Sequence, residues 1–383
     1  MDENTINKLT GEPVSKDFRD VIRRLNENIH VSQEEINELP EIKYAQLCVS
    51  KVQMTKADLE ERKPIQKSVF NRLQNEVKSA KTKSDGEVSY DGEIRCEKRL
   101  DIVIGLPAAG KSSALAEPLS EFYGSRIIDC DEAKKRLPGF DGGWGAGYVH
   151  RESQSVSDEQ FKAAIKKGEN ITYPRVGADC NDLMKYIRQA KNAGYKVYVH
   201  YNELDRNKAL ARMLLRFIET GRYLAPNLID GKSEGIRNTY DELKRSCCDE
   251  PGKLIDGFSH WDNDVPFGER PILKECSESC VDFCKSERQT KRSETRLNPG
   301  ESELIKQLRD EIAQLKTELV KMKYSLEITN TVFAQNPELR SAFRAKRDEL
   351  LKTDIPAKIR EKIFGKKPST TEKATKKPKS PKH

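Results

Sequence analysis

Residues 105–112, which read GLPAAGKS, constrain the fold of this chain more than any other segment. They match the phosphate-binding loop pattern G-x-x-x-x-G-K-[ST]. They follow an apolar run, LDIVI, at Leu100–Ile104 and open a segment whose apolar residues have helical spacing. A strand that runs through a glycine loop into a helix is the setting in which this pattern binds nucleotide phosphates. The sequence therefore predicts a nucleotide-binding loop made of Gly105, Leu106, Pro107, Ala108, Ala109, Gly110, Lys111, Ser112 and Ser113.

The residue types in this loop suit ATP and Mg²⁺. Gly105 and Gly110 admit backbone conformations that are closed to other residues, so that successive N–H groups can surround a phosphate. Lys111 is expected to reach the β- and γ-phosphates, and Ser112 to offer its hydroxyl to Mg²⁺. ATP and Mg²⁺ are therefore the expected cofactors, with Ser112 as the metal-binding residue.

Residues 98–285 alternate between strand-like and helical patterns. The candidate strands are Leu100–Ile104, Arg126–Asp129, Glu169–Tyr173, Lys196–Tyr201 and Lys253–Asp256, and the candidate helices are Ser112–Tyr123, Asp158–Lys167, Asn181–Ala193 and Asn207–Thr220. Such alternation predicts an α/β fold, a doubly wound and mainly parallel sheet with helices on both faces. We expect this region to be a phosphate-loop kinase domain.

The rest of the chain divides into six segments by composition. Residues 1–80 read as a helical N-terminal region, and residues 81–97 and 286–300 read as linkers. Apolar residues at two heptad positions predict a coiled coil over 301–335, which would allow self-association. Residues 336–364 form a further helical segment. Residues 365–383 lack large apolar side chains and are expected to be disordered.

The formal net charge of +7 comes mainly from this lysine-rich tail. Residues 365–383 hold seven lysines and one acid, so they contribute +6 and leave about +1 for the remainder. The net charge is therefore no evidence that the enzyme surface binds nucleic acid. It indicates at most a weak and salt-sensitive binding of the tail to nucleic acid or to an acidic membrane. No apolar run is long enough to span a bilayer and no secretory signal is visible, so we expect a cytoplasmic protein.

Three cysteines recur every four residues, at Cys276, Cys280 and Cys284. On a helix this spacing places the thiols on one face. Structural zinc sites usually combine closer pairs from two places in the chain, so we interpret the three as a small apolar face of a short helix.

An acidic pair stands where the second strand ends. Asp129 and Asp131 lie about 20 residues after the loop, and in a doubly wound sheet that strand end opens toward the phosphates. A carboxylate there can accept the proton of an attacking hydroxyl or hold Mg²⁺ through water. The guanine-reading N-K-x-D of GTPases and the strand-end acids of ATPase motors are not found. This layout favours a small-molecule kinase.

Arginines follow in the segment DRNKALARMLLRFIETGRYLAP. Arg212 and Arg216 share one helical face, and Arg222 lies in the turn after the helix. Guanidinium groups stabilise the charge of a transferring phosphoryl group, so these residues are candidates for a lid over the site.

The segments GLPAAGKSS, IIDCDEAKKRLPGF and RFIETGRYLAP together resemble the zeta toxin family of phosphate-loop kinases, over about residues 98–275. Family members are toxins of toxin–antitoxin systems that phosphorylate the sugar 3′-hydroxyl of UDP-N-acetylglucosamine. The resemblance implies that Lys111 binds the phosphates and that Asp131 is the general base. It also implies that Arg216 and Arg222 contact the transferring phosphate and that an antitoxin, either a separate protein or the N-terminal helical region, restrains the enzyme.

The sequence departs from the family where the acceptor is expected. After the third strand the family has a Glu-Gly-Thr stretch that contacts the sugar nucleotide, whereas this chain has Tyr173-Pro174-Arg175-Val176-Gly177. The glycine-rich loop at 139–153 follows the acidic pair and is either a lining of the acceptor pocket or a mobile turn. A nucleotide sugar is the leading acceptor.

Two alternative functions stay open at this point. One is a kinase of polynucleotide or RNA ends, or of another small molecule, on the same fold. A polynucleotide kinase would need a continuous basic groove, and the kinase region is rich in acids as well as bases. The other is an assembly protein whose coiled coil does the work and whose nucleotide site is a switch.

Overall fold

The computed structural model describes residues 5–7, 12–48, 54–83, 86–143, 145–247, 253–266 and 269–286. These residues belong to one unit of the chain, Met1–Arg292. The predicted coiled coil (301–335), the helical segment after it (336–364) and the lysine-rich tail (365–383) lie outside the described residues, as does the predicted linker after residue 286.

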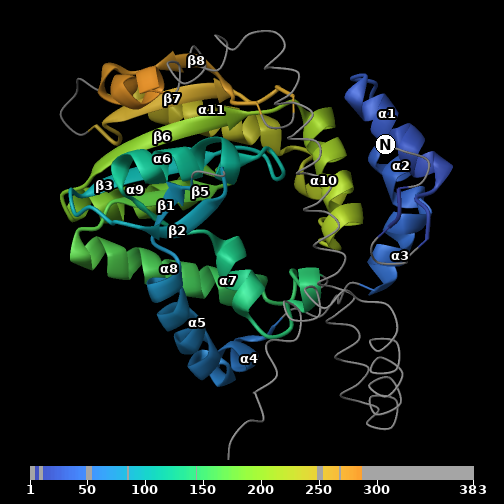
Figure 1. Cartoon of the computed structure of the whole chain (residues 1–383), viewed down its shortest axis with the longest axis horizontal. Helices are drawn as coiled ribbons and strands as arrows, with labels where there is room; N and C mark the ends of the chain where they lie inside the picture. Colours follow the sequence, from blue (N-terminus) through green and yellow to red (C-terminus); the bar gives the residue numbers. More distant parts are fainter. Residues whose placement is uncertain are drawn as a thin grey trace, which may run out of the picture. The chain divides into compact units, whose positions relative to one another are not determined.

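A six-stranded sheet forms the centre of this unit (Figure 1). Its strands, in spatial order, are β4 (Arg126–Ile127), β5 (Ile171–Arg175), β3 (Arg99–Ile104), β6 (Lys196–Glu203), β7 (Gly257–Asp262) and β8 (Ile272–Cys276). The first five are parallel, and β8 is antiparallel to β7. The predicted α/β fold with a mainly parallel sheet is therefore confirmed. Because all five parallel strands end at one edge, the loops that follow them meet there.

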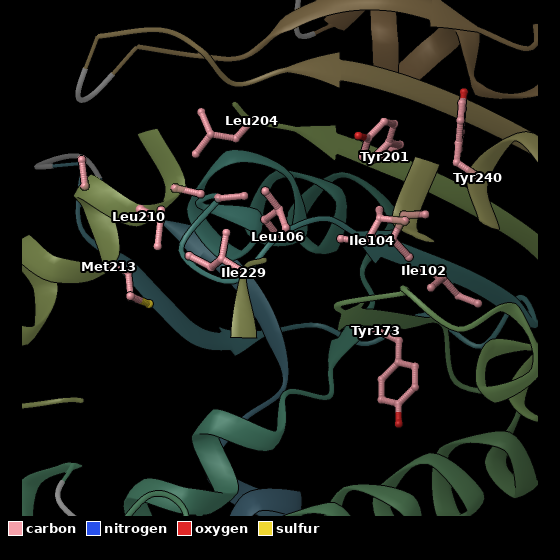
Figure 2. Packing of buried hydrophobic residues seen from close by; sticks show 14 of the residues in the cluster. Ile102, Ile104, Leu106, Tyr173, Tyr201, Leu204, Leu210, Met213, Ile229 and Tyr240 are labelled. Atoms are coloured by element: carbon pink, nitrogen blue, oxygen red, sulfur yellow. The ribbon is translucent and has the colours of Figure 1, made fainter. Parts of the chain in front are cut away.

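Alternate residues of β3 show how both faces of the sheet are covered. Ile102 and Ile104 belong to the larger buried cluster, part of which Figure 2 shows, together with residues of α8 (His150–Lys167), α9 (Cys180–Asn192) and α11 (Lys232–Arg245). Val103 points the other way and packs with the helical turn η1 (Ser112–Ala116), with α6 (Glu117–Tyr123) and with Cys280 and Cys284. Period-two burial on both faces is what a strand between two helical layers requires.

The three cysteines singled out above lie on different elements. Cys276 ends β8, and Cys280 lies in the short turn η4 (Glu278–Cys280). Cys280 and Cys284 are fully buried in the apolar cluster beside Val103. They therefore pack as small apolar side chains.

Three predicted boundaries differ from the structure. Helix α8 begins at His150, eight residues before the predicted start at Asp158. The prediction began too late because the buried residues of the first turns, Glu152, Ser153 and Ser157, are polar and gave no apolar periodicity. Strand β7 begins at Gly257, just after the predicted Lys253–Asp256. The segment predicted as a linker, 81–97, overlaps an antiparallel hairpin of β1 (Ser79–Thr82) and β2 (Val88–Gly92).

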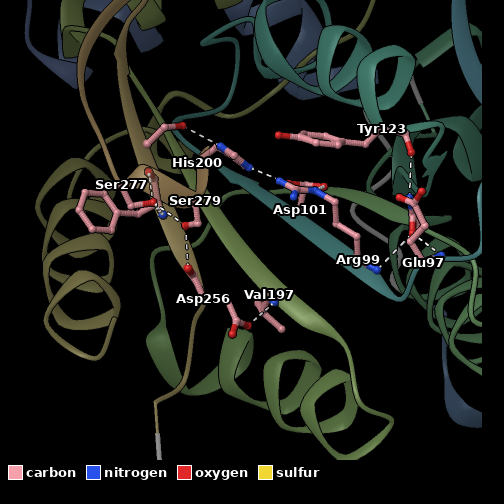
Figure 3. A network of polar contacts seen from close by, with 12 residues as sticks. Glu97, Arg99, Asp101, Tyr123, Val197, His200, Asp256, Ser277 and Ser279 are labelled. Atoms are coloured by element: carbon pink, nitrogen blue, oxygen red, sulfur yellow. Dashed lines mark hydrogen bonds and ion pairs between the residues drawn. The ribbon is translucent and has the colours of Figure 1, made fainter. Parts of the chain in front are cut away.

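A buried chain of polar side chains joins three neighbouring strands (Figure 3). Arg99 donates two hydrogen bonds to Asp101, at 2.8 and 2.7 Å. His200 lies between Asp101 and Ser259, at 2.9 and 2.7 Å, and Trp261 donates to the Ser259 hydroxyl. Burial lowers the pKa of His200, so a neutral ring that donates to Asp101 and accepts from Ser259 satisfies every member. Asp101, His200 and Ser259 have no exposed surface, which makes this a structural network and not a catalytic triad.

The N-terminal helix α1 (Lys16–Asn26) packs on α10 (Arg206–Thr220). Helix α2 (Gln33–Glu38) packs on the turn after α10, η3 (Pro226–Leu228), and on α3 (Pro40–Cys48). Phe18 and Leu25 of α1 are fully buried in the same cluster as Leu210 and Phe217 of α10. Helix α5 (Lys63–Glu76) lies against α7 (Cys130–Arg136) and α8, and α4 (Lys56–Glu61) packs on α5. The outer surface of α10 is thus a buried surface.

No helix of the described residues is both long and apolar enough to cross a membrane.

Replacing Phe18 by alanine tests whether α1 is part of this core. We expect a loss of about 3–5 kcal/mol in the free energy of unfolding, since a fully buried ring leaves a cavity. Urea unfolding measures it, with Leu47→Ala as the control, because Leu47 is 85% exposed and its removal is worth about 0.5 kcal/mol or less. Equal unfolding curves for the two variants would contradict this packing.

Candidate active site

The glycine loop follows β3 directly and wraps around the side chain of Lys111. The Lys111 ammonium donates to the carbonyl oxygens of Gly105 and Leu106, at 2.9 and 2.8 Å. Ala108 and Gly110 have φ values of +61° and +77°, so the loop reverses its backbone twice within three residues. Such left-handed steps turn successive N–H groups toward one side, which forms a nest for an anion. The loop geometry is therefore that of a phosphate-binding loop.

Two asparagines hold this loop from the neighbouring strands. Asn202, near the end of β6, and Asn263, just after β7, both donate to the carbonyl of Ala109, at 2.7 and 2.6 Å. The backbones of Gly105 and Asn202 lie close together, since a Cβ added at Gly105 would be 2.5 Å from the Asn202 carbonyl oxygen. Sequence reasoning missed both asparagines, although their positions at strand ends on the loop's side of the sheet could have indicated them.

The acidic pair lies at the start of α7, where β4 ends. Asp129 caps α7 and accepts from the backbone N–H of Asp131 at 2.9 Å. Burial and the neighbouring charge of Asp131 raise the pKa of Asp129. Burial also acts to raise the pKa of Asp131, but Arg222 and Lys134 outweigh it and hold that pKa far below its usual range. Asp131 therefore stays ionised across the neutral range, whereas Asp129, with its pKa raised to about 6, is the first of the pair to take up a proton as the pH falls.

Arg222 binds the predicted base directly. Its Nη2 lies 2.7 Å from both carboxylate oxygens of Asp131, and Lys134 lies 3.2 Å from one of them. Arg222 and Asp131 are 91 residues apart in the sequence. The Nε of Arg222 is buried and has no hydrogen-bond partner among the residues that the structure describes, so this N–H can donate to a ligand.

The two arginines of α10 have different surroundings. Arg212 donates to the carbonyls of Asn263 and Val265, at 3.1 and 3.2 Å, beside the glycine loop. Burial lowers the pKa of Arg216, and the charges of Arg222 and of the acidic pair also act on that pKa. Arg216 therefore lies within electrostatic range of these three residues. The structure therefore brings Arg216 and Arg222 to the acids and Arg212 to the loop.

The glycine-rich loop packs against the backbone of Arg222. A Cβ added at Gly143 would lie 2.9 Å from the Arg222 Cα, and Gly143 has a φ of +122° that few other residues adopt. Gly139 faces the ring of Tyr148 in the same way. Trp144 lies outside the described residues. The loop thus contacts the arginine that contacts Asp131.

Comparison with known proteins gives one family. Residues 93–255 match the sequence profile of the zeta toxin family. This part of the chain is similar to zeta toxin domains. No curated protein is significantly similar in sequence.

Two solved structures are similar to part of this chain. One is from the PezAT toxin–antitoxin system of Streptococcus pneumoniae, with 13% identity, a TM-score of 0.43, and coverage of 59% of this chain and 84% of that one. The other is the AvrRxo1-ORF1:-ORF2 complex with ATP, with 17% identity, a TM-score of 0.41, and coverage of 62% and 79%. The assignment of the domain rests on the family match.

The match to the zeta toxin family supports a kinase-type phosphotransferase activity that uses ATP. The residues present fit this donor and its metal ion. Ser112 is exposed and follows Lys111 at the start of the helix, and the carboxylate of Asp129 is close enough to Lys111 for its charge to act on the pKa of the lysine. Within the described residues no three His, Cys, Asp or Glu side chains form a metal site by themselves. Mg²⁺ held by one or two residues and by substrate phosphates needs no such group.

The titration of Lys111 predicts a pH limit on ATP binding. Burial lowers the pKa of Lys111 to about 8, so its charge is present below that pH and is lost as the pH rises through it. We expect the affinity of the free protein for ATP to fall between pH 8 and pH 9.5, measured by calorimetric titration. A Lys111→Arg variant should lack this step, since a guanidinium stays charged. The same pH dependence in both proteins would show that another group is responsible.

Proposed function

We propose that this zeta toxin-like domain transfers the γ-phosphoryl group of ATP to a hydroxyl of a nucleotide sugar, with UDP-N-acetylglucosamine as the leading acceptor. We further propose that it acts as a toxin that an antitoxin protein restrains. The observation that carries the proposal is the contact of Asp131 with Arg222, at the strand edge where the glycine loop also lies. A base, a phosphate cradle and mobile cations at one edge are what phosphoryl transfer to an alcohol needs.

Each residue has one task in this reaction. Lys111 exchanges its two carbonyl partners for the β- and γ-phosphates of ATP. The acceptor oxygen forms a bond to the γ-phosphorus, its proton passes to Asp131, and the bond from the γ-phosphorus to the bridging oxygen breaks, which releases ADP. Arg216 and Arg222 bind the charge on the migrating group. Ser112 would hold Mg²⁺, which would supply positive charge against the phosphates.

The contact between Asp131 and Arg222 sets the order of events. A carboxylate held by a guanidinium is ionised but is a weak base, because its pKa is depressed. When Arg222 turns to the phosphate, Asp131 loses this partner and its proton affinity rises. The base therefore becomes effective only after the donor has arrived.

Asp131→Asn tests the base. We expect phosphotransfer from ATP to UDP-N-acetylglucosamine to fall by about 10²–10⁴, because the amide cannot take the proton. Mass spectrometry of the nucleotide sugar measures the product, and free nucleosides and oligonucleotides serve as rival acceptors. Asp17→Asn, on the exposed face of α1, is the matched control and should keep full activity. Undiminished transfer in the Asp131 variant would remove this residue from the mechanism, and product only from oligonucleotides would replace the acceptor class.

Arg216→Ala and Arg212→Ala separate the two arginines of α10. Loss of Arg216 should lower kcat by about 10³ or more, as expected for a guanidinium that binds the transferring group. Loss of Arg212, which lies at the glycine loop, should mainly raise the KM for ATP. Steady-state kinetics with varied ATP measures both. The reverse pattern would exchange their roles.

A further inference from the structure

Two cations lie near the acidic pair in addition to those of the glycine loop and the α10 region: Arg175 and Lys134. Arg175 ends β5, and β5 lies between β4 and β3 in the sheet. Its guanidinium lies beside the start of α7, where Nη1 is 3.5 Å from the sulfur of Cys130, the residue between Asp129 and Asp131. Lys134, one helical turn beyond Asp131, is also buried.

The side chain of Arg175 is held in place on several sides. Its guanidinium carbon lies 5.2 Å from the ring centres of Tyr173 and Tyr186, and its Nη2 binds Asp182 at 3.2 Å. Only 13% of the side chain is exposed, whereas 42% of Asp182 is exposed. A planar cation fixed on aromatic rings with a solvent-screened partner is prepared to bind an anion in a fork.

The positive charge here exceeds what ATP requires. Lys111, Arg216 and Arg222 suffice for the phosphates of the donor. Lys134 and Arg175 are two further cations in this region, and each has a carboxylate partner of its own: Lys134 binds Asp131 and Arg175 binds Asp182. His150, at the start of α8, lies in the same field: burial first and then Lys134 and Arg175 lower its pKa to about 4, so it stays neutral and able to hydrogen-bond. Buried cations in excess of their acids favour an anionic ligand.

We propose that Arg175 and Lys134 form a binding site for a phosphate or diphosphate group of the acceptor, beside Asp131. The inference rests on the proposed kinase function and names the part of the acceptor that this chain recognises. It also gives a reason for the departure from the family at this strand end: a cation stands near the place where the family has an acid. The acceptor hydroxyl would then be positioned through its phosphate and not through hydrogen bonds from a glutamate.

Binding to the protein with its donor site filled tests the proposal without turnover. The full chain is saturated with a non-hydrolysable ATP analogue and Mg²⁺ and titrated in a calorimeter with pyrophosphate, UDP, uridine and N-acetylglucosamine. We expect pyrophosphate and UDP to bind and the two neutral compounds to bind at least tenfold more weakly. Arg175→Gln should weaken the binding of pyrophosphate and UDP by about tenfold or more, as loss of a charge-assisted hydrogen bond does.

Three further proteins complete the design. Arg188→Gln removes an exposed arginine of α9 and should bind as the wild type does. Arg175→Lys keeps the charge and should recover part of the affinity, which a purely structural role would not produce. Lys134→Gln gives a second test should Arg175→Gln fail to fold, and it should weaken the same two probes.

The outcomes separate this inference from the kinase proposal. Equal binding of pyrophosphate and UDP by the wild type, Arg175→Gln and Lys134→Gln would overturn the inference, and so would tighter binding of uridine than of UDP. Phosphotransfer to UDP-N-acetylglucosamine with an acceptor KM unchanged in Arg175→Gln would also overturn it, while the kinase proposal would stand. Arginine-dependent binding of UDP without any phosphotransfer would keep the anion site and remove the proposed reaction.

Discussion

The ion pair between Arg222 and Asp131 is the contact on which the site depends. It joins the start of α7, which follows the edge strand β4, to the segment after α10, and it crosses 91 residues of sequence. The glycine-rich loop packs on the backbone of Arg222, and the N-terminal helix α1 packs on α10. The N-terminal region therefore supports the helix that carries Arg212 and Arg216. In the mechanism that we propose, Asp131 is the base and Arg222 binds phosphate, and this contact would make acceptor activation wait for ATP.

Electrostatics gives the site two sides. In the proposed reaction, Lys111 within its loop, with Arg216 and Arg222, would bind the donor, and burial makes the charges of Lys111 and Arg216 costly without an anion. Arg175 and Lys134 would bind the acceptor. Between them stand two carboxylates with opposite pKa shifts, raised for Asp129 and lowered for Asp131, because only Asp131 touches Arg222 and Lys134. An anionic donor and an anionic acceptor would together neutralise this arrangement.

Local patterns in the sequence were enough to predict the centre of the fold. The strand β3, the glycine loop and the parallel α/β sheet follow from short runs of residues with strong preferences. The first turns of α8 were missed because Glu152 and Ser153 are buried polar residues, which periodicity cannot distinguish from a surface. The contact of Asp131 with Arg222, and the bracing of the loop by Asn202 and Asn263, depend on strand order, which no local pattern contains. A position at a strand end indicates which residues can lie near the loop, but it does not show which of them contact each other.

The central claim is that this site moves a phosphoryl group from ATP to an alcohol. Phosphorus NMR of the protein with ATP, Mg²⁺ and a small-molecule extract of cells tests it directly, without a choice of acceptor. The account predicts that the γ-phosphate signal of ATP declines while signals of ADP and of a new phosphate monoester grow in equal amounts. Growth of inorganic phosphate alone, or unchanged ATP, would contradict it.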